Sequence, residues 1–123
     1  MAAVLDRWVE TAPDREALVG RSGRFSYAAL DAAANRASNA LAALGVQAGD
    51  RVAASLPNDV DVVVAFLGAM RLGAVWVGVN RVLAPPEKAY VLRDCGVRVL
   101  LATAAIAAEV APERGTLPSL EHV

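Results

Sequence analysis

The side chains that most often carry out protein chemistry are scarce in this sequence. It contains one histidine, His122, one cysteine, Cys95, and one lysine, Lys88. A Ser–His–acid triad would have to use His122, which lies in the terminal tail, and a frayed end does not hold a base in place. Cys95 is interpreted as a small buried hydrophobe at a helix end, and Lys88 as a solvated surface residue. We therefore predict no catalytic residue in this chain.

Metal and phosphate sites are also missing from the sequence pattern. One histidine and one cysteine leave no spacing typical of a structural zinc site. Neither G-x-x-x-x-G-K-[ST] nor G-x-G-x-x-G occurs, so the common nucleotide-binding motifs are absent. Residues 20–23 (GRSG) are interpreted as a hairpin turn, and residues 73–78 (GAVWVG) as a strand. We therefore predict no metal ligand and no phosphate loop in this sequence.

The composition excludes several classes of protein. Hydrophobic residues make up 56% and charged residues 20% of the sequence, which excludes a disordered chain. The hydrophobic share is high for a stand-alone domain, and it indicates either a surface covered by further protein or a bias toward alanine. The net charge of −1 leaves no evident basic face, so we predict no nucleic-acid partner.

The sequence also points to a compartment. A single cysteine allows no internal disulfide, which suits a reducing environment. The first 15 residues carry Asp6, Glu10 and Asp14, which no signal peptide would. The apolar stretch at residues 62–70 is far shorter than the ~20 residues that a spanning helix needs. We therefore predict a cytoplasmic protein without a membrane span.

Helical and strand-like segments alternate along the chain. A short helix is expected at residues 4–11, followed by a hairpin of strands 17–19 and 25–27. Residues 27–44 form the clearest helix, with a possible cap at Ser26 and an end at Gly45. Its apolar residues recur at spacings of three and four, so that they share one face: Leu30, Ala34, Ala37, Leu41 and Leu44.

The later part of the chain repeats a strand–helix unit. Strands are expected at 51–56, 74–79 and 97–102, and helices from 58 or 59 to 72, from 86 to 94 and from 103 to 110. The tail, residues 112–123, is expected to be loop-like. Because segment 74–79 is almost entirely apolar, we expect it to be covered on both faces. This alternation predicts an α/β fold, with a parallel sheet and flanking helices.

Several segments, taken together, resemble a known family. They are FSYAAL at 25–30, GV at 45–46, GDRVA at 49–53, LPN at 56–58 and MRLGAVWVGVN at 70–80. In this order and spacing they resemble the first part of the adenylate-forming superfamily, which includes acyl-CoA synthetases, luciferases and peptide-synthetase adenylation domains. The resemblance extends over residues 4–102. It implies that residues 1–123 are the incomplete N-terminal portion of an AMP-binding domain.

The resemblance implies an activity for the parent enzyme. Family members activate a carboxylic acid with ATP and Mg²⁺, form an acyl-adenylate and pyrophosphate, and pass the acyl group to a thiol, often coenzyme A. The similarity is nearest to fatty-acyl and related CoA ligases. The family's Ser/Thr/Gly-rich phosphate loop, its ribose-binding acidic residue and its C-terminal lysine are not in this chain. Since placing and neutralising phosphates is the main task in such chemistry, we expect the isolated chain to be inactive and to bind none of these cofactors tightly.

One residue receives a possible binding role from the resemblance. Many relatives have Asn-Pro-Arg at the turn where this chain has Asn80-Arg81-Val82. In some CoA ligases an arginine at that turn approaches the CoA phosphates, and Arg81 would take that role displaced by one position. The alternative is a surface arginine beside the turn.

Two other functions remain open at this stage. The chain would act as a non-catalytic interaction module on the same α/β scaffold, or as one half of a split enzyme. Its apolar excess favours a surface that binds protein. We expect it to bind the remainder of the enzyme or to self-associate, because its sheet edges and helix faces lack cover.

Overall fold

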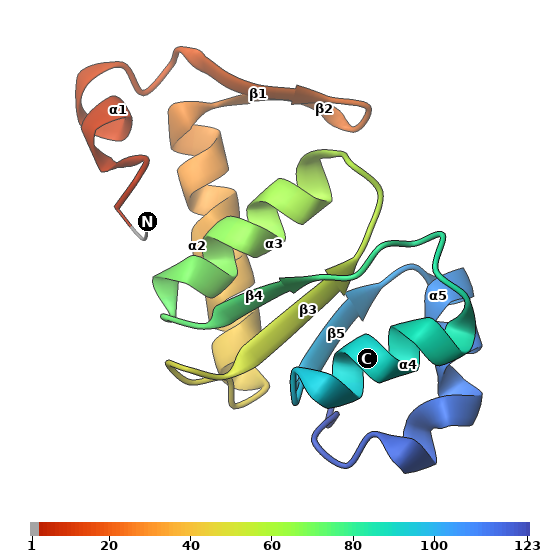
Figure 1. The fold of residues 1–123 in the computed structure, drawn as a ribbon. Helices are drawn as coiled ribbons and strands as arrows, with labels where there is room; N and C mark the ends of the chain where they lie inside the picture. Colours follow the sequence, from red (N-terminus) through yellow and green to blue (C-terminus); the bar gives the residue numbers. More distant parts are fainter. Residues whose placement is uncertain (1–2) are drawn as a thin grey trace.

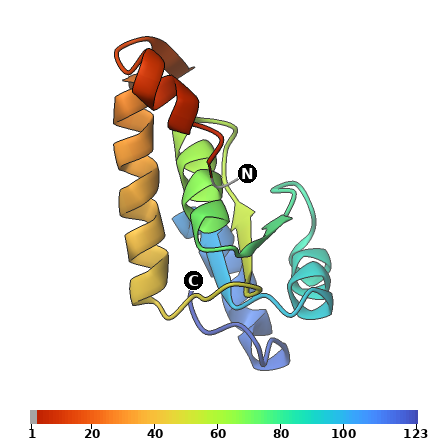
Figure 2. The ribbon, with the colours of Figure 1, turned by 90° about the vertical axis from the view of Figure 1, so that its left-hand side faces the viewer.

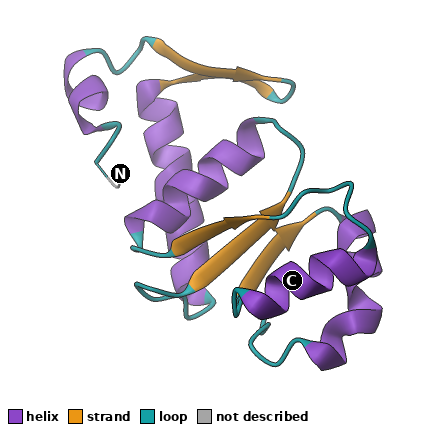
Figure 3. Ribbon diagram, in the orientation of Figure 1, coloured by secondary structure: helices purple, strands orange, loops and turns teal. Residues whose placement is uncertain are grey.

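A three-stranded parallel sheet lies between two layers of helices, and a separate hairpin stands beyond one of these layers (Figure 1 and Figure 3). The structure is a computed structural model and describes residues 3–123. In chain order its elements are α1 (Asp6–Thr11), β1 (Glu16–Gly20), β2 (Gly23–Ser26), α2 (Tyr27–Ala43), β3 (Arg51–Ser55), α3 (Val60–Arg71), β4 (Val75–Gly78), α4 (Pro85–Asp94), β5 (Val99–Ala102), α5 (Ala104–Val110) and the 3-10 helix η1 (Ala111–Thr116). The predicted fold class and the order of the elements are confirmed.

The hairpin of β1 and β2 is antiparallel and closes at Gly20 and Gly23, as predicted for residues 20–23. Gly23 has φ of 136°, which only glycine adopts readily. The hairpin is tied to the first turn of α3, because the Arg21 amide donates a 2.9 Å hydrogen bond to Asp59 Oδ1. Asp59 also caps α3 by accepting a 2.8 Å bond from the Val60 amide, so it is the capping residue of the two candidates at 58 and 59.

The long helix α2 begins and ends close to the predicted residues. Ser26 Oγ accepts a 3.2 Å hydrogen bond from the Ala29 amide at its start. Gly45 follows its end with φ of 82°, the left-handed conformation expected of a helix terminator. Its buried face packs against α3 and, toward the hairpin, encloses an apolar cluster that includes Leu5, Leu30, Ala34 and Leu67.

The central strand of the parallel sheet is β3, in the order β4-β3-β5. Alternate residues of β3 point to opposite faces. Val52 packs beneath α2 and α3 with Leu41 and Ala69, whereas Ala53 packs against α4 with Leu92. Figure 2 shows the resulting three layers, with α2 and α3 on one side of the sheet and α4 on the other.

The expectation that segment 74–79 is covered on both faces is met only in part: Val77 packs on the α4 face and Trp76 on the opposite face, but other residues of the segment are exposed. Within residues 3–123, β4 is an edge strand that pairs only with β3. Val75 is 48% exposed and Gly78 is also exposed. An apolar run indicates that a strand can be buried on both faces, but it does not say which other elements are present to bury it.

The tail is not loop-like as predicted. Residues 111–116 form the 3-10 helix η1, and Leu117 and Leu120 are buried against α4 and α5. His122 then forms a parallel bridge beside β5, where the Leu100 amide donates a 3.0 Å hydrogen bond to the His122 carbonyl oxygen. The backbone at His122 is therefore held by the sheet, and the reason we gave against a base at this position, a frayed end, is wrong.

Candidate functional site at the carboxyl ends of β3 and β4

A cavity of about 490 Å³ opens where β3 and β4 end. The chain leaves β3 toward α3 on one face of the sheet and leaves β4 toward α4 on the other, so the two loops diverge (Figure 1). Such a switch point between neighbouring parallel strands is where open α/β sheets bind ligands. The cavity is lined by Ala54, Leu56, Asn58, Val62, Trp76, Gly78, Val79, Asn80, Arg81 and Val82.

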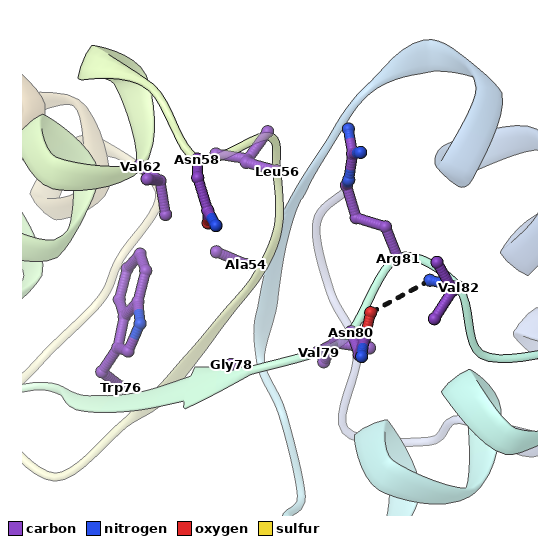
Figure 4. A pocket seen from close by; sticks show the side chains of 10 residues that line it. All are labelled: Ala54, Leu56, Asn58, Val62, Trp76, Gly78, Val79, Asn80, Arg81 and Val82. Carbon is purple, nitrogen blue, oxygen red and sulfur yellow. Dashed lines mark hydrogen bonds between the residues drawn. The ribbon is translucent and has the colours of Figure 1, made fainter. Parts of the chain in front are cut away.

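The two walls of the cavity differ in chemistry. Figure 4 shows the indole of Trp76 and the side chain of Val62 on the wall formed by α3 and the sheet, with the Asn58 side chain beside Val62 and above the indole. The ring of Trp76 is held edge-on by Phe66, with ring centroids 5.5 Å apart. The opposite wall is the loop after β4, which carries Asn80 and Arg81. An apolar wall facing a polar one suits an amphiphilic ligand.

Arg81 is exposed, and its guanidinium extends away from its own loop (Figure 4). No ion pair within residues 3–123 involves it, and among the residues drawn in Figure 4 it makes no hydrogen bond. A guanidinium carries five N–H donors and a permanent positive charge. Arg81 can therefore bind an anion, such as a phosphate, at the mouth of the cavity.

The backbone that carries Arg81 is fixed on both sides of it. The Val79 amide donates a 2.9 Å hydrogen bond to the Ala54 carbonyl oxygen. Asn80 Oδ1 accepts a 3.1 Å bond from the Val82 amide, which closes a tight turn around Arg81. Glu87 Oε2 accepts a 2.7 Å bond from the Ala84 amide, which fixes the start of α4.

The interpretation of Lys88 as a solvated surface residue is wrong. Lys88 is 1% exposed, and its Nζ donates to the Leu83 carbonyl oxygen at 2.5 Å and to Glu109 Oε2 at 2.7 Å. The interpretation failed because it assigned an isolated lysine to solvent, whereas the partner carboxylate lies 21 positions away, on α5. A buried ammonium is tolerated when it is paired and hydrogen-bonded.

Asn58 and Trp76 were not singled out from the sequence as site residues. One signal could have found Asn58: it lies two residues after a predicted strand, at the end of the sheet where the carboxyl ends of parallel strands meet. Trp76 lies inside a strand and gave no such signal. Cys95 ends α4 and is half-buried against the α4 core, as expected of a small hydrophobe.

Two other observations bear on the functional class. Among residues 3–123, no group of three or more His, Cys, Asp and Glu side chains could hold a metal ion. In the same part of the chain, no helix combines the length and apolar character needed to cross a bilayer.

A polar cluster lies at the opposite edge of the sheet, at the amino ends of β3 and β5. Arg98 donates to Asp50 Oδ2 at 2.7 Å and to Glu121 Oε2 at 3.0 Å. The Gln47 amide, which donates to the Asp50 carboxylate, and then Arg98 lower the pKa of Asp50. The hydrogen bonds to Asp50 and Glu121 raise the pKa of Arg98. The cluster joins the loop before β3 to the C-terminal tail, far from the cavity.

The comparison with known protein families decides the family. The family described as "AMP-binding enzyme" matches residues 5–123, which is nearly the whole chain. The chain belongs to this family. The resemblance inferred from the order of short segments is thereby confirmed. The prediction that its relatives are acyl-CoA ligases is also confirmed, by the proteins described next.

Individual relatives of this AMP-binding chain act on different acids. The long-chain-fatty-acid–CoA ligase FadD13 of Mycobacterium tuberculosis is 46% identical over 78 residues, covering 63% of this chain and 16% of the relative. The 3-hydroxybenzoate–CoA ligase of Aromatoleum sp. is 40% identical over 94 residues, covering 76% of this chain and 18% of the relative.

A solved structure shows the same fold. The crystal structure of the anthranilate CoA ligase AuaEII in complex with anthranoyl-AMP superimposes with a TM-score of 0.92 at 35% identity, over 98% of this chain and 23% of that one. The chain therefore spans only 16% to 23% of these three relatives.

Proposed function

We propose that the protein acts as an ATP-dependent acid–CoA ligase, to which this chain contributes the N-terminal part of the AMP-binding domain. In that reaction a carboxylic acid and ATP form an acyl-adenylate and pyrophosphate, and the acyl group then passes to the thiol of coenzyme A. The match to the AMP-binding family over residues 5–123 carries the proposal. We propose a fatty acid as substrate because the 46% identical relative is a long-chain-fatty-acid–CoA ligase.

The contribution of this chain to ligand binding is Arg81. We propose that its guanidinium contacts a phosphate of coenzyme A at the mouth of the β3–β4 cavity. Its exposure and its freedom from ion pairs within residues 3–123 support this role, since a bound phosphate would then have no internal carboxylate to displace. The amides of Asn58 and Asn80 would face the polar part of the same ligand.

The residues of this chain do not form a binding site for Mg²⁺ or for a nucleoside triphosphate. Mg²⁺ is usually held in an octahedron by one or two carboxylates together with waters and phosphate oxygens, and no acidic residue lines the cavity. The sequence also lacks a glycine-rich phosphate loop. We therefore propose that other parts of the ligase bind ATP and Mg²⁺ and that the 123-residue chain alone is inactive.

An exchange assay tests the proposed function. The chain would be purified alone and together with the remaining three quarters of the M. tuberculosis fatty acyl-CoA synthetase, of which 25% has the same fold as this chain. We expect ATP–pyrophosphate exchange with fatty acids from the pair only. Exchange by the isolated chain would contradict our assignment of the chemistry to other segments, and no exchange by a well-folded pair would contradict the proposed function.

Substitution of Arg81 tests the phosphate contact. In the reconstituted pair, Arg81→Gln should raise KM for coenzyme A by about tenfold, because one charge-assisted contact is lost, and leave the pyrophosphate-exchange step unchanged. Arg93→Gln, on the exposed side of α4, is the matched control with the same change in charge. Equal KM values for coenzyme A in the Arg81 variant and the wild type would show that Arg81 is only a surface residue.

A second candidate function is favoured by another cavity. An apolar groove of about 440 Å³ lies between α2, α3 and β5 and includes Leu41, Leu44, Val64 and Leu101. Leu44 is 38% exposed and Val123 is 52% exposed at its margin. We propose that this surface binds the remainder of the ligase, with self-association when that is missing. Sedimentation of the chain with and without the reconstitution partner tests this, and a monomer in both cases would contradict it.

We propose that the protein is located in the cytoplasm, because its single cysteine would stay reduced there. Fractionation of cells that express the tagged protein tests this, and a signal in the envelope fraction would contradict it.

A further inference from the structure

The one lysine of the chain is buried directly beneath the loop that carries Arg81. We propose that Lys88 is a positioning residue, which holds the loop of residues 79–84 where Arg81 can reach a ligand in the β3–β4 cavity. This inference rests on the proposed phosphate contact of Arg81. The inference explains what holds the Arg81 side chain near the ligand. The sequence pattern did not indicate this role of Lys88.

The Nζ of Lys88 connects three segments. Lys88 lies in the first turn of α4, and its Nζ donates to the Leu83 carbonyl oxygen at 2.5 Å, inside the loop. The same atom donates to Glu109 Oε2 at 2.7 Å, on α5. The Lys88 side chain is 2% exposed and that of Glu109 is 41% exposed. The ammonium is thus enclosed, and its carboxylate partner is at the surface.

Burial makes this contact geometrically demanding. An ammonium removed from water is costly unless its donors are paired. The Leu83 carbonyl oxygen and Glu109 supply two acceptors from different directions. If Leu83 shifted, the enclosed ammonium would lose one of its two acceptors. The ammonium therefore holds the Leu83 carbonyl group in place.

Lys88 complements the contacts that the loop makes near the surface. Asn80 Oδ1 and Glu87 Oε2 accept bonds from the Val82 and Ala84 amides, and both of these contacts are exposed. Exposed contacts open easily because water replaces them. The bond from Lys88 to Leu83 is the partly buried one among these three. It fixes the loop two residues after Arg81.

Amide hydrogen exchange on the 123-residue chain tests the positioning. Lys88→Met keeps a long apolar stem and removes the ammonium. We expect the Val82 and Ala84 amides to exchange about tenfold faster in this variant, while the Val79 amide, bonded to β3, keeps its rate. Arg93→Met is the matched control, because it removes the same charge from an exposed residue of the same helix, and its loop amides should exchange within about threefold of the wild type.

The wild-type chain supplies a readout that needs no substitution. A bond of 2.5 Å should give a measurable scalar coupling between the Lys88 side-chain nitrogen and the Leu83 carbonyl carbon in labelled protein. A missing coupling, or loop exchange in Lys88→Met that rises only as much as exchange in β3, would overturn the proposal. If Lys88→Met does not fold, the scalar coupling decides.

A titration with coenzyme A separates positioning from general stability. We expect weak binding to the chain, followed by the chemical shift of the backbone amide at position 81, and a Kd raised about fivefold by Lys88→Met and by Arg81→Gln. The double variant should bind no more weakly than Arg81→Gln alone, because Lys88 acts through Arg81. Multiplied effects would assign Lys88 a merely structural role. A wild-type chain without any shift in coenzyme A would contradict the proposed role of Arg81, while the exchange rates would still decide whether Lys88 holds the loop.

Discussion

Gly68 of α3 lies against Ala37 of α2 so closely that a Cβ added to Gly68 would be 2.7 Å from the Ala37 Cβ. The same Cβ would lie 2.9 Å from the Ser38 amide nitrogen, which is backbone and cannot rotate away. The two helices therefore cross at a point where only glycine fits. This crossing supports the face of the sheet that carries Trp76.

Gly68→Ala should destabilise the chain by about 1–3 kcal/mol, because overpacking must push the two helices apart. Urea unfolding followed by circular dichroism measures the loss. Gly78→Ala is the control, since nothing lies within 4 Å of a Cβ at that position. A Gly68→Ala variant as stable as Gly78→Ala would mean that the helices separate without cost.

Arg71 joins the same two helices by hydrogen bonds. Its guanidinium donates to Asp31 Oδ1 and Asn35 Oδ1, both at 2.5 Å, and to the Asp31 carbonyl oxygen at 3.0 Å. Its side chain is 14% exposed, so solvent screens these bonds only partly. Arg71→Met should lower the free energy of unfolding by about 1–2 kcal/mol.

The exposed pair of Arg24 and Glu16 is the matched comparison for Arg71. The Arg24 side chain is 73% exposed, and Arg24→Met should change the free energy of unfolding by less than about 0.5 kcal/mol. Chemical denaturation of both variants decides the matter. Equal losses for Arg71→Met and Arg24→Met would show that burial does not strengthen the Arg71 contacts.

The lowered pKa of Asp50 predicts that the stability of the chain falls at acid pH. Its pKa in the folded chain is lowered by the Gln47 amide and then by Arg98. Its contribution is therefore fully present above the unfolded pKa of about 4 and is lost as pH falls through the folded pKa. The melting temperature of wild type should exceed that of Asp50→Asn at pH 7, and the difference should shrink as pH falls below about 4. A difference that stays constant down to pH 2 would contradict this sign.

Ser55 ends β3 with a buried hydroxyl that has no hydrogen-bond partner among residues 3–123, and the residue is 1% exposed. A buried hydroxyl without a partner costs stability. Ser55→Ala should therefore leave the chain equally stable or stabilise it by up to about 1 kcal/mol, as measured by urea unfolding. A loss of more than that amount would show that the hydroxyl has a partner in solution.

Local patterns predicted the elements well. The helix expected at 27–44 is found at Tyr27–Ala43, because its apolar spacing, its serine cap and its terminal glycine all lie within the segment itself. The strands after Gly49, Gly73 and Gly96 were found for the same reason. What failed depended on distant partners: the exposure of Val75, the burial of Lys88 and the packing of the tail around Leu117.

The candidate site was only partly predictable. Arg81 was named from the family resemblance at its turn, and it lines a cavity, but the sequence did not indicate that Trp76 and Val62 would form the opposite wall. These walls meet because β3 and β4 are neighbours whose loops lead to opposite faces of the sheet.

The amino-acid sequence by itself determined the order of helices and strands, the α/β class and the membership of the AMP-binding family, because periodicity, caps and short motifs act over a few residues. Only the tertiary structure decided that β3 lies at the centre of the sheet, that the lysine is enclosed beneath the Arg81 loop and that the C-terminal tail extends the sheet at His122. Each of these depends on contacts between residues 20 or more positions apart, such as that of Lys88 with Glu109. No local pattern specifies the partner in such a contact, because the partner is chosen by the packing of the whole chain.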